Sequence, residues 1–262
     1  MSMAINSLPP PLTKAPPSVF YLPDFISIQE EAELLAKVLG APRPKWVQLK
    51  NRRCSAGGVV SPKGMVGEPV PSWLTTPLFD RLKQLNVFTA NDGSPYAPNH
   101  VLINEYLPGQ GIMPHLDGPA YFPTVATVSL GSHCILEFFK YNKDGDPSQG
   151  INEMGSSTKG GNKDTAVEDK EKHSSDRPRR QPDFSLLVQP RSLLVLKDQV
   201  YTGYMHGIRE ITEDDLTDAC IVNMDQQPSG LPTCLERGTR ISLTLRKVER
   251  VLSASKLLMA RK

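Results

Sequence analysis

The segment 113–119 carries two side chains that could bind a metal ion. His115 and Asp117 are separated by one residue, so in an extended chain both side chains project to the same side. With a second histidine they would form a face of two imidazoles and one carboxylate, which leaves positions open on a non-haem Fe(II) ion. A His-x-Asp pair alone is weak evidence, because such pairs also occur as ordinary surface residues.

The third ligand would have to be a histidine further along the chain. His173 lies in a polar segment, and His133 directly follows a turn. We favour His206, because it lies in a short β-like run and precedes Gly207, which would allow another backbone to approach closely. The alternative is that His206 is a buried, hydrogen-bonded histidine of the core.

The segment 240–246, Arg-Ile-Ser-Leu-Thr-Leu-Arg, is the most informative in the chain. Side chains alternate between the two faces of a strand, so this strand has one apolar and one polar face. The apolar face carries Ile241, Leu243 and Leu245. The polar face carries Arg240, Ser242, Thr244 and Arg246. This polar row could simply meet water, but two guanidiniums separated by two hydroxyls also match a site for a small dianionic acid.

A third strand-like segment, residues 102–106, supplies polar groups of another kind. Asn104 and Tyr106 share one face and offer an amide and a phenol for hydrogen bonds to a small molecule. Ile103 faces the core. Glu105 lies on the same apolar side, where a carboxylate is unusual, and we therefore expect it near a strand end.

The first half of the sequence predicts two helices. Ser27 and Glu30 have the spacing of a capping box, and Gly40 ends the apolar stripe that follows. A second helix is expected to begin at Thr76, with Pro77 in its first turn. The intervening residues 41–71 are rich in proline and glycine, so loops and short strands are expected there.

The second half predicts strands. At least seven short apolar runs, broken by turns and preceded by two helices, indicate a mainly β (α+β) fold. We expect a β-sandwich or jelly roll with the helices packed on one side. The expected strands are 100–106, 124–130, 133–139, 184–188, 192–197, 201–208 and 239–248, and residues 19–25 form an earlier apolar run that is broken by Pro23.

Composition excludes several other classes. The 24 prolines and 19 glycines leave no room for long heptad repeats, and no apolar run is long enough to span a membrane. The four cysteines are scattered without a Cys-x-x-Cys pair, which is typical of a reducing compartment. We therefore expect a protein of the cytoplasm and nucleus that does not bind membranes.

The domain organisation follows from these patterns. Residues 140–183 are too polar to bury a core, so a mobile insertion is expected there. The expected parts are a flexible N-terminus (1–17), a region of helices and substrate-recognition loops (18–97), a catalytic β core (98–250) interrupted by the insertion, and a basic tail (251–262). We expect the protein to be a monomer.

In chain order, the motifs are Asn-x-Tyr, His-x-Asp, His and Arg-x-Ser-x-Thr-x-Arg. This combination resembles the AlkB family of Fe(II)- and 2-oxoglutarate-dependent dioxygenases, and most of all a eukaryotic branch of that family. Residues 99–119, 124–131 and 238–246 carry most of the resemblance, which covers most of the chain outside the insertion.

The resemblance implies a double-stranded β-helix, or jelly roll, that holds iron inside its mouth. Its metal ligands would be His115, Asp117 and His206. Arg240 would bind the distal carboxylate of 2-oxoglutarate. The residues orienting this co-substrate would be Asn104, Tyr106, Ser242 and Arg246. The family pattern often has Asn where Ser242 stands, and a hydroxyl can also donate to a carboxylate.

The implied reaction uses Fe(II), 2-oxoglutarate and O2. Oxidative decarboxylation of 2-oxoglutarate gives succinate and CO2, and hydroxylation of an N-methyl group releases formaldehyde. The family preference is for N-methylated RNA or DNA, single-stranded or with the base flipped out. Two alternatives stay open: a non-catalytic reader of modified nucleic acid, and an oxygenase that acts on protein side chains.

Substrate contacts are the least constrained by the sequence. The stretch 43–63 has six basic residues and no acidic one, which permits binding to a polyanion, but charge alone favours a solvated face. Candidate contacts are Trp46, Arg52, Arg53, Tyr121 and Phe122. Trp46 could instead be a packing aromatic, whereas Tyr121 and Phe122 closely follow the His-x-Asp pair.

Overall fold

The computed structural model describes residues 7–61, 64–90, 92–141 and 180–252. All of these described residues except 180 and 181 belong to one compact unit. The predicted insertion and the predicted basic tail lie mostly outside the described residues. No helix in these described ranges is long and apolar enough to cross a membrane.

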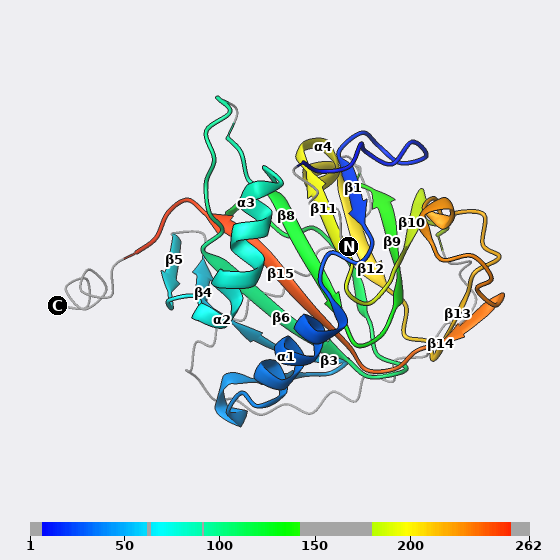
Figure 1. Cartoon of the computed structure of the whole chain (residues 1–262), viewed down its shortest axis with the longest axis horizontal. Coiled ribbons are helices and arrows are strands. Elements are labelled where there is room, and N and C mark those ends of the chain that lie inside the picture. Colours follow the sequence, from blue (N-terminus) through cyan, green and yellow to red (C-terminus); the bar gives the residue numbers. More distant parts are fainter. Residues whose placement is uncertain (1–6, 62–63, 91, 142–179, 253–262) are drawn as a thin grey trace, which may run out of the picture. The chain divides into compact units, whose positions relative to one another are not determined.

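A seven-stranded antiparallel sheet forms the centre of this unit (Figure 1). In spatial order its strands are β1 (Val19–Leu22), β11 (Leu193–Lys197), β8 (Tyr121–Leu130), β15 (Arg240–Val248), β6 (His100–Tyr106), β3 (Arg52–Ala56) and β2 (Val47–Leu49). The strand with the alternating arginines, β15, lies between β8 and β6 and has a neighbour on each side.

A four-stranded antiparallel sheet forms a second layer. Its strands are β10 (Phe184–Val188), β9 (Cys134–Lys140), β12 (Tyr204–Ile208) and β7 (Ile112–His115). Apolar side chains of both sheets pack together, for example Phe138 and Leu186 with Val125 and Leu194. Two antiparallel sheets enclosing one apolar layer form a jelly roll, so the predicted mainly β fold is confirmed.

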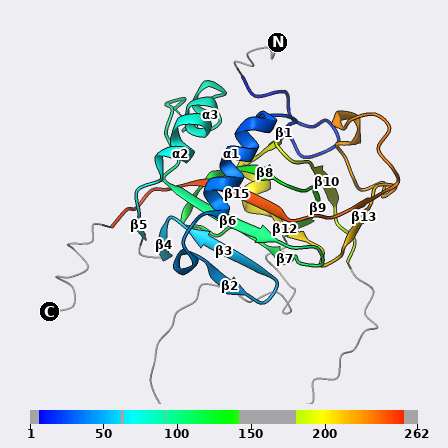
Figure 2. The same ribbon diagram turned by 60° about the horizontal axis from the view of Figure 1, so that its bottom comes forward.

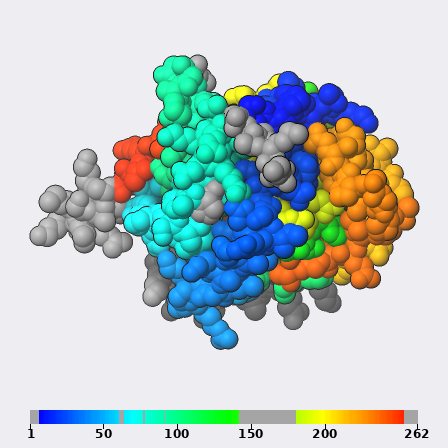
Figure 3. Space-filling view, in the orientation of Figure 1, coloured from blue at the N-terminus to red at the C-terminus, as the bar shows by residue number. Residues whose placement is uncertain are grey.

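The helices cover the outer face of the larger sheet. Leu34 and Val38 of α1 (Ile28–Leu39) and Leu82 of α3 (Asp80–Gln84) share one buried cluster with Leu243 and Leu245 of β15. In the space-filling view these helices hide much of the sheet behind them (Figure 3). Burying the apolar row of β15 on this side leaves its polar row facing the interior between the two sheets.

The first helix has the predicted capping box. The Ser27 hydroxyl accepts the N–H of Glu30, and the Glu30 carboxylate accepts the N–H of Ser27. Gly40 is the C-cap residue. Arg81 of α3 also donates to the Glu30 carboxylate, so a hydrogen bond connects the first turn of α1 to α3.

The second helical segment begins earlier than predicted. It runs through α2 (Ser72–Leu74), a π-helical turn η2 (Thr75–Phe79) and α3. The predicted start at Thr76 is wrong, because Pro77 lies inside η2 rather than in a first turn. Proline lacks the N–H that an α-helical hydrogen bond needs, and a widened turn accommodates that loss.

The predicted strand at 201–208 is correct only in its second half. A short helix, α4 (Asp198–Gly203), precedes β12. Val200 and Tyr201 are adjacent in sequence and both buried, which a helical turn permits but the alternation of a strand does not. The other predicted strands are confirmed, with ends that differ by a few residues.

Four short strands and two short helices complete the described elements. A hairpin of β4 (Gly58–Ser61) and β5 (Gly64–Gly67) follows β3, and β13 (Glu213–Asp215) pairs with β14 (Cys234–Glu236). The 3-10 helices are η1 (Arg43–Lys45) and η4 (Met224–Gln226).

Candidate metal and co-substrate site

Three potential metal ligands converge between the two sheets. One ligand atom from each of His115, Asp117 and His206 lies within 4.8 Å of the other two. His115 ends β7, Asp117 follows it, and His206 lies at the middle of β12. Two imidazoles and one carboxylate at this separation suit a single metal ion with open positions.

The pairing of β7 with β12 creates this convergence. His115 and His206 are directly opposite in the antiparallel register, with ring centroids 4.5 Å apart. A Cβ atom at Gly207 would lie 2.9 Å from the backbone nitrogen of Pro114. The predicted role of Gly207 is thus confirmed, because any larger residue would push the two strands apart.

The histidines have the protonation state that a metal requires. Burial lowers the pKa of His115, and burial followed by the charge of His115 lowers the pKa of His206 to about 4. The His115 Nδ1 lies 2.9 Å from the carbonyl oxygen of Met113. Because a carbonyl only accepts hydrogen bonds, this contact fixes the proton on Nδ1 and leaves the Nε2 lone pair for a metal.

The carboxylate ligand is held by one of the predicted arginines. The Nε and Nη2 of Arg246 donate to the two carboxylate oxygens of Asp117, and both side chains are buried. Burial alone would raise the pKa of Asp117, but the charge of Arg246 keeps it below the ordinary value. Arg246 therefore fixes the orientation and the charge of a metal ligand. Its predicted contact with 2-oxoglutarate stays a prediction.

The polar row of β15 faces the polar pair of β6. In the antiparallel register Arg240 lies opposite Tyr106, and Ser242 lies opposite Asn104. All four residues are buried. The row does not meet water, so that alternative is wrong.

This row retains hydrogen-bonding capacity for a ligand. Arg240 Nη2 donates to Ser129 Oγ of β8 at 2.9 Å, but its Nε has no partner. The side-chain oxygen of Asn104 is also buried without a partner. Unpaired buried polar groups are costly, and a carboxylate oxygen of a bound dicarboxylate would accept a hydrogen bond from the Arg240 Nε. The donor set therefore fits 2-oxoglutarate.

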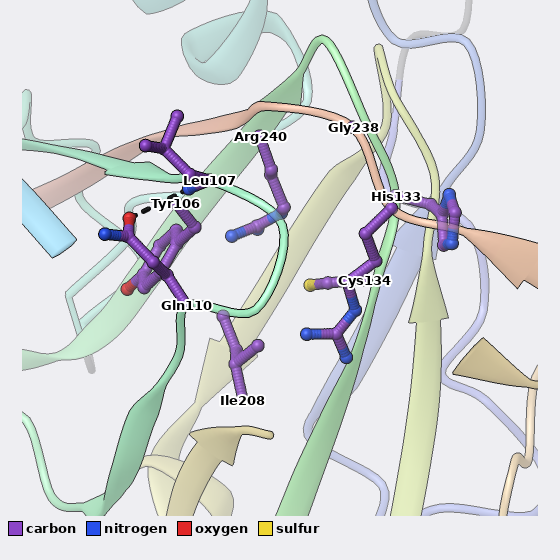
Figure 4. A pocket seen from close by; sticks show the side chains of 9 residues that line it. Tyr106, Leu107, Gln110, His133, Cys134, Ile208, Gly238 and Arg240 are labelled. Atoms are coloured by element: carbon purple, nitrogen blue, oxygen red, sulfur yellow. Dashed lines mark hydrogen bonds between the residues drawn. The ribbon is translucent and has the colours of Figure 1, made fainter. Parts of the chain in front are cut away.

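A pocket opens at the Arg240 end of this row (Figure 4). Arg240 and Tyr106 line it together with Gln110, Cys134 and Ile208. Burial raises the pKa of Tyr106 to about 12, against the opposing charges of Arg240 and Arg52. Tyr106 is therefore a neutral hydrogen-bond donor beside a guanidinium, as a carboxylate ligand requires.

The other end of the row lies beside Tyr121 and His100. The Arg246 guanidinium lies 4.9 Å from the centroid of the Tyr121 ring. The His100 ring lies 5.4 Å from the same ring. Tyr121 is therefore placed next to the metal ligands through Arg246. Phe122 points elsewhere and packs on Tyr96, with ring centroids 4.8 Å apart.

The remaining substrate candidates belong to the hairpin of β2 and β3, which extends the sheet beyond β6 (Figure 2). Arg53 donates to the Glu105 carboxylate at 2.6 Å, and its guanidinium lies 4.4 Å from the Trp46 ring centroid. Arg52 alternates with Arg53 and projects to the opposite face, where its charge acts on Tyr106 and His115. The structure thus brings Arg52 near the site, whereas Arg53 pairs with Glu105 on the opposite face of the sheet.

Three residues beside the site were not expected from the sequence: Ser129, His100 and Cys134. Ser129 shares a face with Thr127 and Val125 on β8, and the alternation of that strand could have indicated it. No local pattern indicates that Cys134 lies in the pocket beside Arg240, because the two residues come from different sheets.

Comparison with known proteins agrees with this geometry. The model of the 2OG-Fe(II) oxygenase superfamily matches residues 18–246. The chain therefore belongs to the 2OG-Fe(II) oxygenase superfamily, whose members use Fe(II), 2-oxoglutarate and O2. The three ligands and the Arg240 row supply a place for the first two of these.

The resemblance to AlkB proteins is confirmed as well. The chain is 40% identical over 243 residues to the "Probable RNA/DNA demethylase ALKBH6" of Danio rerio, covering 92% of this chain and 90% of that protein. The eukaryotic branch indicated by the motifs is this sixth homologue. A second relative, the "Alkylated DNA repair protein ALKBH8 homolog" of Arabidopsis thaliana, is 27% identical over 241 residues, covering 88% of this chain and 58% of that protein.

Structural comparison supports the fold. The solved structure of OsALKBH1 matches with a TM-score of 0.52 and 14% identity, covering 89% of this chain and 99% of that chain. At this identity the match concerns the arrangement of the strands alone.

Proposed function

We propose that this oxygenase demethylates N-methylated nucleic acid, RNA or DNA. The convergence of His115, Asp117 and His206 beside the Arg240 row supports the proposal, because these side chains suit a metal ion next to a dicarboxylate. The printed name of the Danio rerio relative, a probable RNA/DNA demethylase, supplies the preference for nucleic acid.

The bound iron supplies the oxidising chemistry, and the protein supplies binding, orientation and exclusion of water. His115 and His206 present neutral imidazoles, and Arg246 holds Asp117 ionised. Arg240 and Tyr106 bind the distal carboxylate of 2-oxoglutarate in the pocket of Figure 4. Hydroxylation of an N-methyl group gives a hemiaminal, which releases formaldehyde and leaves the demethylated base.

Substrate enters past the hairpin of β2 and β3 and past Tyr121. Arg52 presents a positive charge on the face of the sheet that carries Asn104 and Tyr106, which suits a phosphate of the substrate backbone. Tyr121 presents an aromatic ring close to Arg246 and the metal ligands, which suits stacking on a base.

The test is a screen of methylated RNA and DNA oligonucleotides with Fe(II), ascorbate and 2-oxoglutarate. We expect loss of the methyl group from the oligonucleotide, with formaldehyde and succinate formed in equal amounts. Tight binding of a methylated oligonucleotide without succinate above background would indicate a reader instead. Addition of one oxygen atom to a protein partner, with no oligonucleotide demethylated, would indicate a protein oxygenase.

The monomeric state and the location in cytoplasm and nucleus remain predictions from the sequence. Analytical ultracentrifugation would test the first, and imaging of the tagged protein would test the second.

A further inference from the structure

Glu105 is a buried carboxylate on the face of β6 that points away from the site. Its neighbours Asn104 and Tyr106 face the interior between the sheets, whereas Glu105 lies opposite Arg53 of β3. Glu105 is 7% exposed. A carboxylate is seldom buried unless it is paired, so its position depends on the partner that it meets.

That partner connects Glu105 to the edge of the sheet. Arg53 Nη2 donates to Glu105 Oε2 at 2.6 Å, and the Arg53 guanidinium lies 4.4 Å from the ring centroid of Trp46, just before β2. Glu105, Arg53 and Trp46 thus link β6 to β3 and to the start of β2. We call these three side chains the outer relay.

The hairpin has a second attachment at its tip. The side-chain amide of Asn51 donates to the carboxylate of Glu210, which follows two residues after the end of β12. The hairpin is therefore fastened on one side to the strand that carries Asn104 and Tyr106. On the other side it is fastened to the segment that follows the strand of His206.

We propose that the outer relay is a positioning device that holds the β2–β3 hairpin, and Arg52 with it, on the face of the sheet that carries Asn104 and Tyr106, and that it thereby sets the affinity for a polynucleotide. Arg52 and Arg53 alternate, so fixing Arg53 on the outer face fixes Arg52 on the inner face. In this account Arg53 and Glu105 do not touch the substrate. This inference rests on the proposed function.

The direction in which one substitution changes the affinity for a polynucleotide distinguishes a positioning role of Arg53 from direct contact with the substrate. If Arg53 bound a phosphate directly, Glu105→Gln would remove the negative charge that pairs with the Arg53 guanidinium. The guanidinium would then be free to bind phosphate, and binding of a polyanion would become tighter. If the outer relay positions the hairpin, the same substitution loosens β3 and binding becomes weaker.

The binding experiment uses the full chain with Mn(II) and 2-oxoglutarate, so that no turnover occurs. The probe is a fluorescein-labelled single-stranded oligodeoxynucleotide, followed by fluorescence anisotropy. We expect Glu105→Gln to raise the Kd for the probe about tenfold, the loss expected for one charged hydrogen bond. The Kd for 2-oxoglutarate should change less than about twofold, because Glu105 faces away from that site.

A matched control is available on the same part of the chain. Glu68 pairs with Lys45 at 3.4 Å, and both side chains are largely exposed. Glu68→Gln removes the same charge without touching the outer relay, so it should leave the Kd unchanged or slightly lower. Arg53→Gln should weaken binding at least as much as Glu105→Gln, because it breaks the same link and also leaves the Glu105 carboxylate buried without its partner. The double variant should bind no more weakly than Arg53→Gln.

A spectroscopic measurement tests the relay without nucleic acid. The chain has two tryptophans, Trp46 and Trp73, so Trp73→Phe leaves Trp46 as the single reporter. Adding Glu105→Gln should change its emission, because the guanidinium loses the partner that holds it over the ring. Arg53→Lys, which keeps the charge but not the planar group, should give an intermediate emission.

The two claims fail in different ways. If the wild-type protein binds neither this probe nor the same sequence made as RNA, the proposed function is overturned, and with it the recognition role of the outer relay. If the wild-type protein binds the probe and Glu105→Gln binds equally or more tightly, the relay alone is overturned. Unchanged Trp46 emission in Glu105→Gln would also overturn the relay.

Discussion

The arginine row of the site, on β15, and the β2–β3 hairpin belong to the same sheet but are held in different ways. The arginines of the site come from β15, which has paired strands on both sides and helices on its outer face. The hairpin lies at the edge, where β3 is paired with β6 and β2 is paired with β3 alone. Substitutions in the interior should therefore affect stability and chemistry together, and those in the hairpin mainly recognition.

The largest expected effect concerns Arg246. Arg246→Gln leaves the buried carboxylate of Asp117 without its bidentate partner, and breaking such a pair costs about 3–5 kcal/mol. We expect the free energy of unfolding of the metal-free protein to fall by this amount in urea denaturation. Added Mn(II) should restore part of it, because the ion replaces the lost positive charge. A decrease in the free energy of unfolding of less than about 1 kcal/mol would show that this pair contributes no more than an ordinary surface ion pair.

The second effect is a pH dependence at His100. Burial, followed by the charge of Arg246, lowers the pKa of His100 from 6.5 to about 4. As the pH falls through this interval, the unfolded chain binds a proton at His100 and the folded protein does not. Acid therefore favours unfolding, by up to about 3 kcal/mol at pH 4.

His100→Gln removes this proton and should flatten the stability profile between pH 6.5 and pH 4. The measurement is urea denaturation of both proteins across that interval. Parallel profiles for the wild-type protein and the variant would contradict the lowered pKa of His100.

The third effect concerns the co-substrate. Arg240→Lys replaces a planar fork by a point charge, so the Kd for 2-oxoglutarate should rise about tenfold to a hundredfold, as expected for one charged hydrogen bond. Calorimetry with Mn(II) measures it. Ser242→Asn, which introduces the residue that the AlkB pattern often has, should change the Kd less than about threefold. An equal loss in both variants would contradict the assignment of Arg240 as the principal carboxylate ligand.

The smallest effect is expected for the exposed ion pair between Lys45 and Glu68. Glu68→Gln breaks an ion pair whose side chains are 59% and 61% exposed, so it should change the free energy of unfolding by less than about 0.5 kcal/mol. Glu105→Gln breaks a pair whose carboxylate side chain is 8% exposed and should cost more. If the two variants have the same free energy of unfolding, the buried pair of Glu105 and Arg53 is no more stabilising than the exposed pair of Glu68 and Lys45.

The sequence predicted the interior better than the edge for a physical reason. In β15 alternation and burial act on every residue, so the pattern at 240–246 indicates both faces correctly. Gly207 beside His206 likewise indicates a close strand approach. These signals are local and can be recognised without knowing the neighbouring strands.

Contacts between distant residues could not be predicted in this way. Glu105 was expected near a strand end because a buried carboxylate on an apolar face has no local explanation, and its partner Arg53 is 52 residues away. The pairing of Arg246 with Asp117 spans 129 residues. The helical turn of α4 was missed because Val200, Tyr201 and Thr202 favour a strand by propensity, and tertiary packing overrides that preference.

The most direct test is an anaerobic titration of the protein with Fe(II) in the presence of 2-oxoglutarate. The wild-type chain should bind one ferrous ion, whereas Asp117→Ala should bind none under the same conditions and produce no succinate when oxygen is admitted. If Asp117→Ala binds iron as tightly as the wild-type chain, the ligand set of His115, Asp117 and His206 is contradicted.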